Sequence, residues 1–253
     1  MQVIEMQKDK IFGINPVIEA LKSGRPVQRL LVLDQRKADR DMLEIIRLAK
    51  SNGIEIRMTS RDALNREAPN TVHQGVIAFA AAREYAVLDD ILAIPAEKKQ
   101  TPLFLILDGV EDPRNLGAIL RTSEAAGVHG VIIPERRAAG LTDTVAKTAA
   151  GALEYVPVVK VVNIVNTLED LKKSGIWVAA AEAGGDSVYW DADFVRPTAL
   201  VLGGEDKGVR RLVRERCDYV VSLPLMGRIN SLNVSVAAGI LLYEALRQRR
   251  ALR

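Results

Sequence analysis

The feature of this sequence that most restricts its fold is an unbroken apolar run, Leu-Phe-Leu-Ile-Leu, at residues 103–107, which ends at Asp108. A strand that is apolar on both faces is typical of a parallel sheet with helices on both sides. From this run onward, strand-like and helix-like segments alternate. The alternation predicts an α/β fold with a mostly parallel sheet. The predicted strands are 103–108, 131–133, 158–162, 176–181, 199–202 and 219–223, and the predicted helices are 115–126, 142–150, 163–173, 209–216 and 233–250.

The first 80 residues alternate in the same way but in shorter segments. Asn15 followed by Pro16 predicts a helix start, with the asparagine as the cap, and Gly24 predicts the helix end. Ser60 predicts the cap of another short helix. The pattern is that of a small α/β domain near the lower size limit for independent folding. The other predicted elements are strands at 30–33, 54–58 and 75–79 and a helix at 39–50.

Residues 81–100 differ in composition from the segments on either side. A weak helical pattern at 88–94 is followed by Pro95, a charged run and Pro102. Charge between prolines is typical of a linker. We therefore predict three parts, which are residues 1–80, 81–100 and 101–253.

The few cysteine and histidine residues exclude several kinds of site. Cys217 alone can form neither a disulfide framework nor a Cys-x-x-Cys metal site. His73 and His129 are not spaced as metal ligands, and no Gly-x-Ser-x-Gly motif supports a Ser-His-acid triad. No apolar run reaches membrane-spanning length, and the chain does not start with a signal-sequence pattern. We therefore expect a cytoplasmic protein with no metal site and no membrane contact.

Arginine is unevenly distributed, although the formal net charge is only +3. Solvated helix faces would explain each arginine cluster taken alone. Arginine rather than lysine favours phosphate binding, because the guanidinium group matches phosphate geometry. The clusters are Arg136 and Arg137; Arg210, Arg211, Arg214 and Arg216; and Arg247, Arg249, Arg250 and Arg253.

Three polar, turn-rich segments follow predicted strands, at 108–117, 203–208 and 223–235. Ligands bind parallel α/β sheets beyond the carboxyl ends of the strands, so these segments are the candidate sites. The glycines of 203–208 allow a close backbone approach to a ligand, but Val209 follows where a Walker A motif requires Lys-Ser/Thr.

Simple structural roles remain open for several polar residues of these segments. Asn115 fits a plain helix cap, and Arg121 fits a surface helix position. Ser231 or Asn233 fits the cap of the last helix. The residues alone therefore indicate an α/β ligand-binding domain with a small companion domain.

In their order and spacing, the three segments resemble the motifs of the SpoU (TrmH-like) family of RNA ribose 2′-O-methyltransferases, in the SPOUT class. The matched motifs span 112–122, 203–208 and 223–237, and the resemblance covers 101–253. The segments 12–17 and 73–76 are similar to the small ribosomal-protein-like RNA-binding domain of the same family. Together they are most similar to the branch that methylates a guanosine in 23S ribosomal RNA. Asp206 and Ala149 stand where many members have glycine and serine.

The resemblance implies a fold, a cofactor and a set of site residues. It implies a trefoil knot at the C-terminal end of the sheet, S-adenosyl-L-methionine as methyl donor, and a homodimer through the C-terminal domain. Residues 1–80 would bind the RNA substrate, and 101–253 would form the SPOUT methyltransferase domain. The implied catalytic residues are Asn115, Arg121, Glu205, Ser231 and Asn233, and the implied cofactor-binding residues are Gly203, Leu223 and Leu232.

Arg121 has two possible roles under this resemblance. The family proposal makes it the general base, although a guanidinium normally stays protonated. We favour a clamp on the RNA phosphate that also stabilises the developing alkoxide. Asn115 and Ser231 would position the ribose or Arg121, and Glu205 would orient Arg121 or polar groups near the cofactor.

Three other functions remain compatible with the sequence. They are methylation of transfer RNA, methylation of ribosomal RNA that confers antibiotic resistance, and RNA binding or ribosome assembly without catalysis. The candidate RNA-backbone contacts in the N-terminal part are Arg25, Arg29, Arg36 and Lys37.

Overall fold

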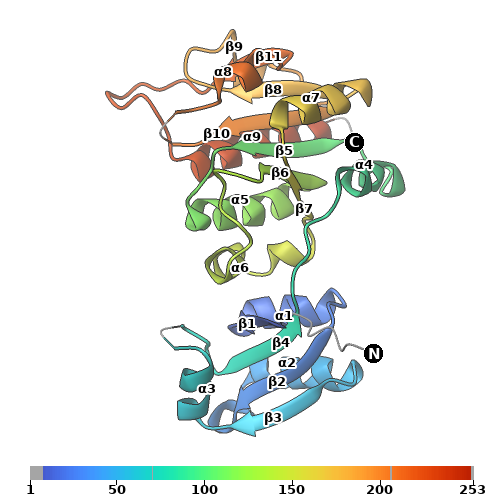
Figure 1. The fold of residues 1–253 in the computed structure, drawn as a ribbon, viewed down its shortest axis with the longest axis vertical. Helices are drawn as coiled ribbons and strands as arrows, with labels where there is room; N and C mark the ends of the chain where they lie inside the picture. The colour runs from blue at the N-terminus through green and yellow to red at the C-terminus, as the bar shows by residue number, and fades with distance from the viewer. Residues whose placement is uncertain (1–7, 70, 206, 252–253) are drawn as a thin grey trace. The chain divides into compact units, whose positions relative to one another are not determined.

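The computed structural model describes residues 8–69, 71–205 and 207–251, which form two compact units (Figure 1). The first unit joins the chain up to Glu84 with a later segment, Leu141–Tyr155. The second unit joins Tyr85–Gly140 with the chain from Val156 onward. Each unit has its own sheet.

The first unit is a four-stranded sheet with the strand order β1-β4-β2-β3. β4 pairs antiparallel with β1 and β2, whereas β2 and β3 are parallel. The apolar sides of α1 and α2 pack on one face, and Leu64 of α3 packs on the other. The elements are β1 (Lys8–Phe12), α1 (Ile14–Lys22), β2 (Val27–Leu33), α2 (Arg40–Ser51), β3 (Glu55–Thr59), α3 (Arg61–Glu67), β4 (Val76–Ala81) and α6 (Asp143–Ala149).

The predicted start of the first helix is wrong. α1 begins at Ile14, so Asn15 lies inside it and not at the cap. Gly13 holds the cap position with φ 92°, a conformation that favours glycine. The Ile14 N–H donates instead to Oε1 of Gln74, at 3.0 Å, so a distant side chain replaces the local cap.

Two further local features of this unit differ in how well the sequence reveals them. The predicted cap at Ser60 is confirmed, because its Oγ accepts a hydrogen bond from the N–H of Ala63. β1 has no counterpart among the predicted strands. β1 lies at the edge of the sheet and pairs only with β4, so it needs few apolar side chains. Its charged residues therefore give no apolar pattern from which a strand could be predicted.

Ion pairs and a hydrogen bond join the later segment of this unit to the earlier one. The Glu154 carboxylate lies between the guanidinium groups of Arg25 and Arg83, and all three side chains are largely buried. The Tyr155 hydroxyl donates to Glu19 at 2.6 Å. A buried carboxylate is stable only with such partners, so these contacts fix the segment in place.

The second unit confirms the predicted parallel α/β fold. Its seven strands have the order β7-β6-β5-β10-β8-β11-β9, and every pair is parallel. The elements are α4 (Leu88–Glu97), β5 (Leu103–Asp108), α5 (Pro113–Ala126), β6 (Gly130–Pro134), β7 (Val158–Val161), α7 (Ile164–Lys173), β8 (Trp177–Ala181), β9 (Ser187–Val188), β10 (Thr198–Gly203), α8 (Arg211–Arg214), β11 (Tyr219–Ser222) and α9 (Val234–Arg250).

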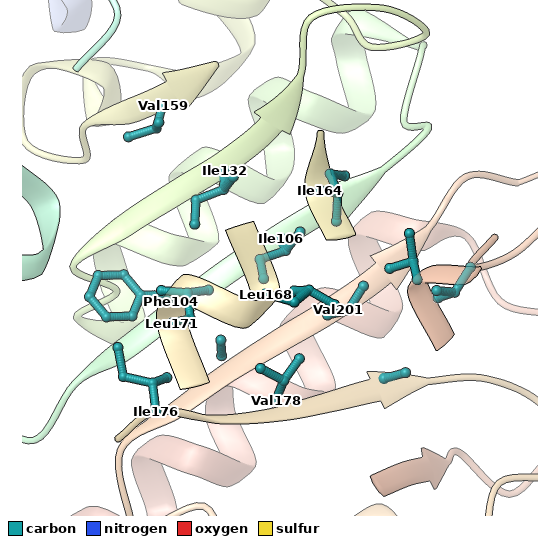
Figure 2. Close-up of a cluster of buried hydrophobic side chains, with 14 of the residues drawn as sticks. Phe104, Ile106, Ile132, Val159, Ile164, Leu168, Leu171, Ile176, Val178 and Val201 are labelled. Carbon is teal, nitrogen blue, oxygen red and sulfur yellow. The ribbon is translucent and has the colours of Figure 1, made fainter. Parts of the chain in front are cut away.

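β5 is buried along its whole length, as its apolar run predicts. Phe104 and Ile106 pack with Leu168 of α7 and Val201 of β10 in the core of one face (Figure 2). Side chains alternate between faces along a strand, so Leu105 points to the opposite face. α5 and α9 pack against each other on that face.

The parallel strands bring the three candidate segments to one edge of the sheet. β5 ends at Asp108, β10 at Gly203 and β11 at Ser222, and the three segments begin at or directly after these ends. The trefoil knot implied by the family resemblance stays a prediction. Within the described ranges, no helix combines the length and the apolar character needed to cross a membrane.

His129 makes the stability of this unit depend on pH. Burial lowers the pKa of its imidazole from 6.5 to about 4, and Nδ1 accepts from the N–H of Leu103 at 3.1 Å. Between these pH values the unfolded chain binds a proton that the folded chain does not bind. The free energy of unfolding should therefore fall as the pH drops from 6.5 to about 4.

Urea unfolding across this pH range measures the effect. His129→Gln should reduce the dependence, and only in part, because burial also lowers the pKa of His73. Equal pH dependence in the variant and the wild type would contradict the assignment.

Candidate active site

A cavity of about 370 Å³ opens at the carboxyl edge of the seven-stranded sheet. Its walls come from the ends of β8 and β10, from the loop after β10, and from the loop between β11 and α9. The residues that line it are Ala181, Glu182, Ala183, Leu202, Gly203, Gly204, Glu205, Gly208, Leu223, Leu225, Asn230, Ser231, Leu232, Val234 and Ala237.

Glycines let the backbone close tightly on one side of this cavity. A Cβ on Gly203 would lie 1.9 Å from the carbonyl carbon of Gly208, and a Cβ on Gly204 would lie 2.1 Å from the carbonyl oxygen of Gly109. The turn closes with a hydrogen bond from the Gly208 N–H to the Gly204 carbonyl, at 3.0 Å. A larger residue at Gly203 or Gly204 would push these backbone segments apart.

Two carboxylates anchor the loop that follows the glycines. Asp108 is buried, and it accepts hydrogen bonds from the backbone N–H of Arg210 at 2.8 Å and from its Nε at 2.7 Å. Glu182 accepts from the Val209 N–H at 3.2 Å and pairs with Nε of Arg214 at 3.0 Å. Glu182 is not among the predicted site residues, although it directly follows a predicted strand.

Three predicted site residues form one chain of hydrogen bonds. Nδ2 of Asn115 donates to Oε1 of Glu205, and Oδ1 of Asn115 accepts from Nδ2 of Asn233 at 3.0 Å. Asn115 is buried in the first turn of α5. These hydrogen bonds therefore link the first, second and third candidate segments.

The plain cap interpretation of Asn115 is wrong, because the Asp112 side chain caps α5 by accepting from the N–H of Arg114. The cap interpretation of Asn233 is confirmed, because its Oδ1 accepts from the N–H of Ser235 at 2.9 Å. Asn233 still contributes its amide nitrogen to the hydrogen-bond chain, so one side chain serves both purposes.

Several of the predicted site residues line the cavity. They are Gly203, Glu205, Leu223, Ser231 and Leu232.

Arg121 is exposed on α5 and does not line the cavity. No hydrogen bond or ion pair joins it to another residue of the described chain. Asp206, where the second motif departs from many family members, lies outside the described residues.

Two other kinds of site, a metal centre and a reactive cysteine, would depend on histidine, cysteine and carboxylate residues of the described chain. In the part of the chain that the structure describes, histidine, cysteine and carboxylate residues form no group of three able to hold a metal ion. Burial raises the pKa of the Cys217 thiol to about 12, which keeps it protonated at neutral pH. A reactive cysteine needs a lowered pKa, so Cys217 is not a candidate nucleophile.

Known proteins share both parts of this chain. Residues 102–243 match the SpoU rRNA Methylase family, and residues 10–86 match a family described as RNA 2′-O ribose methyltransferase substrate binding. The protein YacO of Bacillus subtilis, named as a TrmH family tRNA/rRNA methyltransferase, is 46% identical over 97% of this chain and 98% of its own. A Staphylococcus aureus protein named for the same family is 43% identical over 96% of this chain and 98% of its own.

A solved structure shares the fold over nearly the whole chain. The SpoU methyltransferase AviRb of Streptomyces viridochromogenes, in complex with the cofactor AdoMet, superposes with a TM-score of 0.80. It is 30% identical, and the match covers 96% of this chain and 91% of AviRb. Motifs, fold and relatives agree, and the chain belongs to the SpoU (TrmH-like) family of RNA methyltransferases.

Proposed function

We propose that this protein transfers a methyl group from S-adenosyl-L-methionine to a ribose 2′-hydroxyl, on a guanosine of 23S ribosomal RNA. The observation that carries the proposal is the hydrogen-bond chain of Asn115, Glu205 and Asn233 beside the glycine-lined cavity. The description of the family that matches residues 10–86 names RNA 2′-O ribose methyltransferases, which supports the ribose as acceptor.

The cavity suits S-adenosyl-L-methionine in shape and chemistry. Gly203 and Gly204 line the cavity, and a side chain on either residue would clash with the backbone of Gly208 or Gly109 and distort the cavity wall. Leu223, Leu225 and Leu232 supply an apolar surface for the adenine ring. When bound, the cofactor supplies an electrophilic methyl group on a sulfonium. The protein must align the ribose oxygen with that group and assist removal of the hydroxyl proton.

The hydrogen-bonded side chains would orient the acceptor. Asn115 is held on both ends of its amide, so its position is fixed before RNA arrives. Ser231 is exposed and lines the cavity, so its hydroxyl is accessible to a ribose. Arg121 would clamp the RNA phosphate and stabilise negative charge on the 2′-oxygen.

The proposal also includes a homodimer through the C-terminal domain, in the cytoplasm. Val236 and Tyr243 of α9 are 50% and 53% exposed and lie seven residues apart, which places them on one side of the helix. Exposed apolar side chains on one helix face support a contact with a second copy. In this proposal residues 1–80 bind RNA, 81–100 are a linker, and 101–253 carry the reaction.

Transfer RNA is the second candidate substrate, because the name of the YacO relative includes it. Isotopically labelled S-adenosyl-L-methionine, 23S ribosomal RNA and total transfer RNA separate the two. A mapped 2′-O-methyl guanosine in the ribosomal RNA would support the proposal, and label in transfer RNA alone would overturn its substrate. If the protein binds the cofactor but labels neither pool nor an immature ribosomal particle, the proposed reaction is wrong.

Asn115→Ala should lower kcat about 30-fold while leaving the cofactor dissociation constant within a factor of two, because positioning contributes to the rate. The variant removes the link between Glu205 and Asn233 but no cavity wall. Single-turnover methylation and calorimetric cofactor titration measure the two quantities. Gly239→Ala is the control, because a Cβ there meets its nearest atom at 3.9 Å. Unchanged kcat in Asn115→Ala would contradict the role.

A further inference from the structure

Two arginine clusters that are far apart in the sequence line one groove of about 1020 Å³ in the second unit. Arg136 and Arg137 follow β6, and Arg210, Arg211 and Arg216 lie in and around α8. Neither the spacing nor the composition of the chain predicts that these clusters meet.

Positive side chains dominate the lining of the groove. Five arginines and one carboxylate, that of Glu135, line it, and three of the arginines are paired with carboxylates outside the lining. Arg136 and Arg137 have no ion pair with another described residue. Unpaired guanidinium groups on one wall of a groove are available for an external anion.

The other three arginines of the groove have carboxylate partners. The Arg210 side chain is held by buried Asp108, and Arg211 and Arg216 pair with Glu215 and Glu169 at the surface. Surface pairs of this kind are weak, so they yield easily to a stronger anion.

The groove and the cofactor cavity are connected through one residue. The side-chain carboxylate of Asp108 accepts hydrogen bonds from Arg210. The backbone carbonyl oxygen of Asp108 accepts a hydrogen bond from the N–H of Gly204 at 2.9 Å. Both sites therefore lie at the carboxyl edge of the same sheet, with Asp108 between them.

We propose that this groove binds the phosphate backbone of the RNA substrate, on nucleotides away from the one that is methylated. The proposal rests on the proposed function for the identity of the polyanion. Several guanidinium groups along a groove match a chain of phosphodiesters, because each fork can hold one phosphate by two hydrogen bonds. Exposed Val162 and Leu212 line the same groove and add apolar surface beside the charges.

The test uses the full chain with Arg136→Gln and Arg137→Gln combined. Neither residue lies at the cavity or in the hydrogen-bond chain, so cofactor binding and kcat should not change. Binding of a short fluorescein-labelled RNA stem-loop is measured against salt. The loss of two phosphate contacts should reduce the slope of log K against log salt by about 1.5. In methylation of ribosomal RNA, KM should rise roughly tenfold, as expected for lost ground-state binding.

Lys98→Gln combined with Arg250→Gln is the matched control, because it removes the same charge from exposed residues outside the groove. Its salt slope should equal that of the wild type. Equal slopes for the groove variant and this control would overturn the groove proposal, even if methylation is normal. A reduced slope specific to the groove variant, without methylation of any RNA, would keep the groove and overturn the proposed function. Weaker binding of an acidic peptide, with RNA binding unchanged, would also contradict the RNA assignment.

Discussion

Gly203→Ala should weaken binding of S-adenosyl-L-methionine at least about 100-fold, which corresponds to about 2.7 kcal/mol. The new Cβ would lie 1.9 Å from the Gly208 carbonyl carbon and 2.1 Å from the Val209 nitrogen. Both are backbone atoms, so no side-chain rotation relieves the clash. The turn between Gly203 and Gly208 must open, and that turn forms one wall of the cavity.

Calorimetric titration with the cofactor measures the loss, and thermal unfolding separates it from misfolding. Gly227→Ala is the control in a neighbouring segment, because a Cβ there would meet its nearest atom at 4.0 Å. That variant should bind the cofactor as the wild type does. If Gly203→Ala binds normally while folded, the cavity does not hold the cofactor.

The parallel sheet was predictable because its signal lies in continuous segments. The apolar run at Leu103–Asp108 indicates a strand buried on both faces, and the structure places that strand inside the sheet. β1 and β9 were not predictable in the same way. β9 is a two-residue strand, too short for a periodic pattern, and β1 is mostly charged.

The candidate site was predictable only as far as strand order allows. Parallel strands bring their carboxyl ends to one edge, so the three polar segments were expected to lie together. Which side chains meet depends on loop paths that no local pattern encodes. Asn115 and Asn233 are 118 positions apart, and their contact follows from the tertiary fold alone. The same holds for Glu182, since its place after a predicted strand does not reveal that it contacts Val209 and Arg214.

Arg121→Ala should lower kcat/KM about 1000-fold, or about 4 kcal/mol, if the guanidinium stabilises charge in the transition state. The same variant should keep its melting temperature and its cofactor affinity. Arg121 is exposed, has no ion pair with another described residue, and does not line the cavity. A large catalytic loss without a structural loss would distinguish a functional arginine from a surface one.

The pH dependence of the residual rate then separates the two roles open to Arg121. If Arg121 is a clamp, the ionisation in the wild-type pH–rate profile persists in Arg121→Ala, because the base is another group. If Arg121 is the general base, that ionisation is absent from the profile of Arg121→Ala. Arg250→Ala, which removes another exposed arginine, should match the wild type in rate and profile. Normal kcat/KM in Arg121→Ala would contradict both roles and leave Arg121 as a solvated residue of α5.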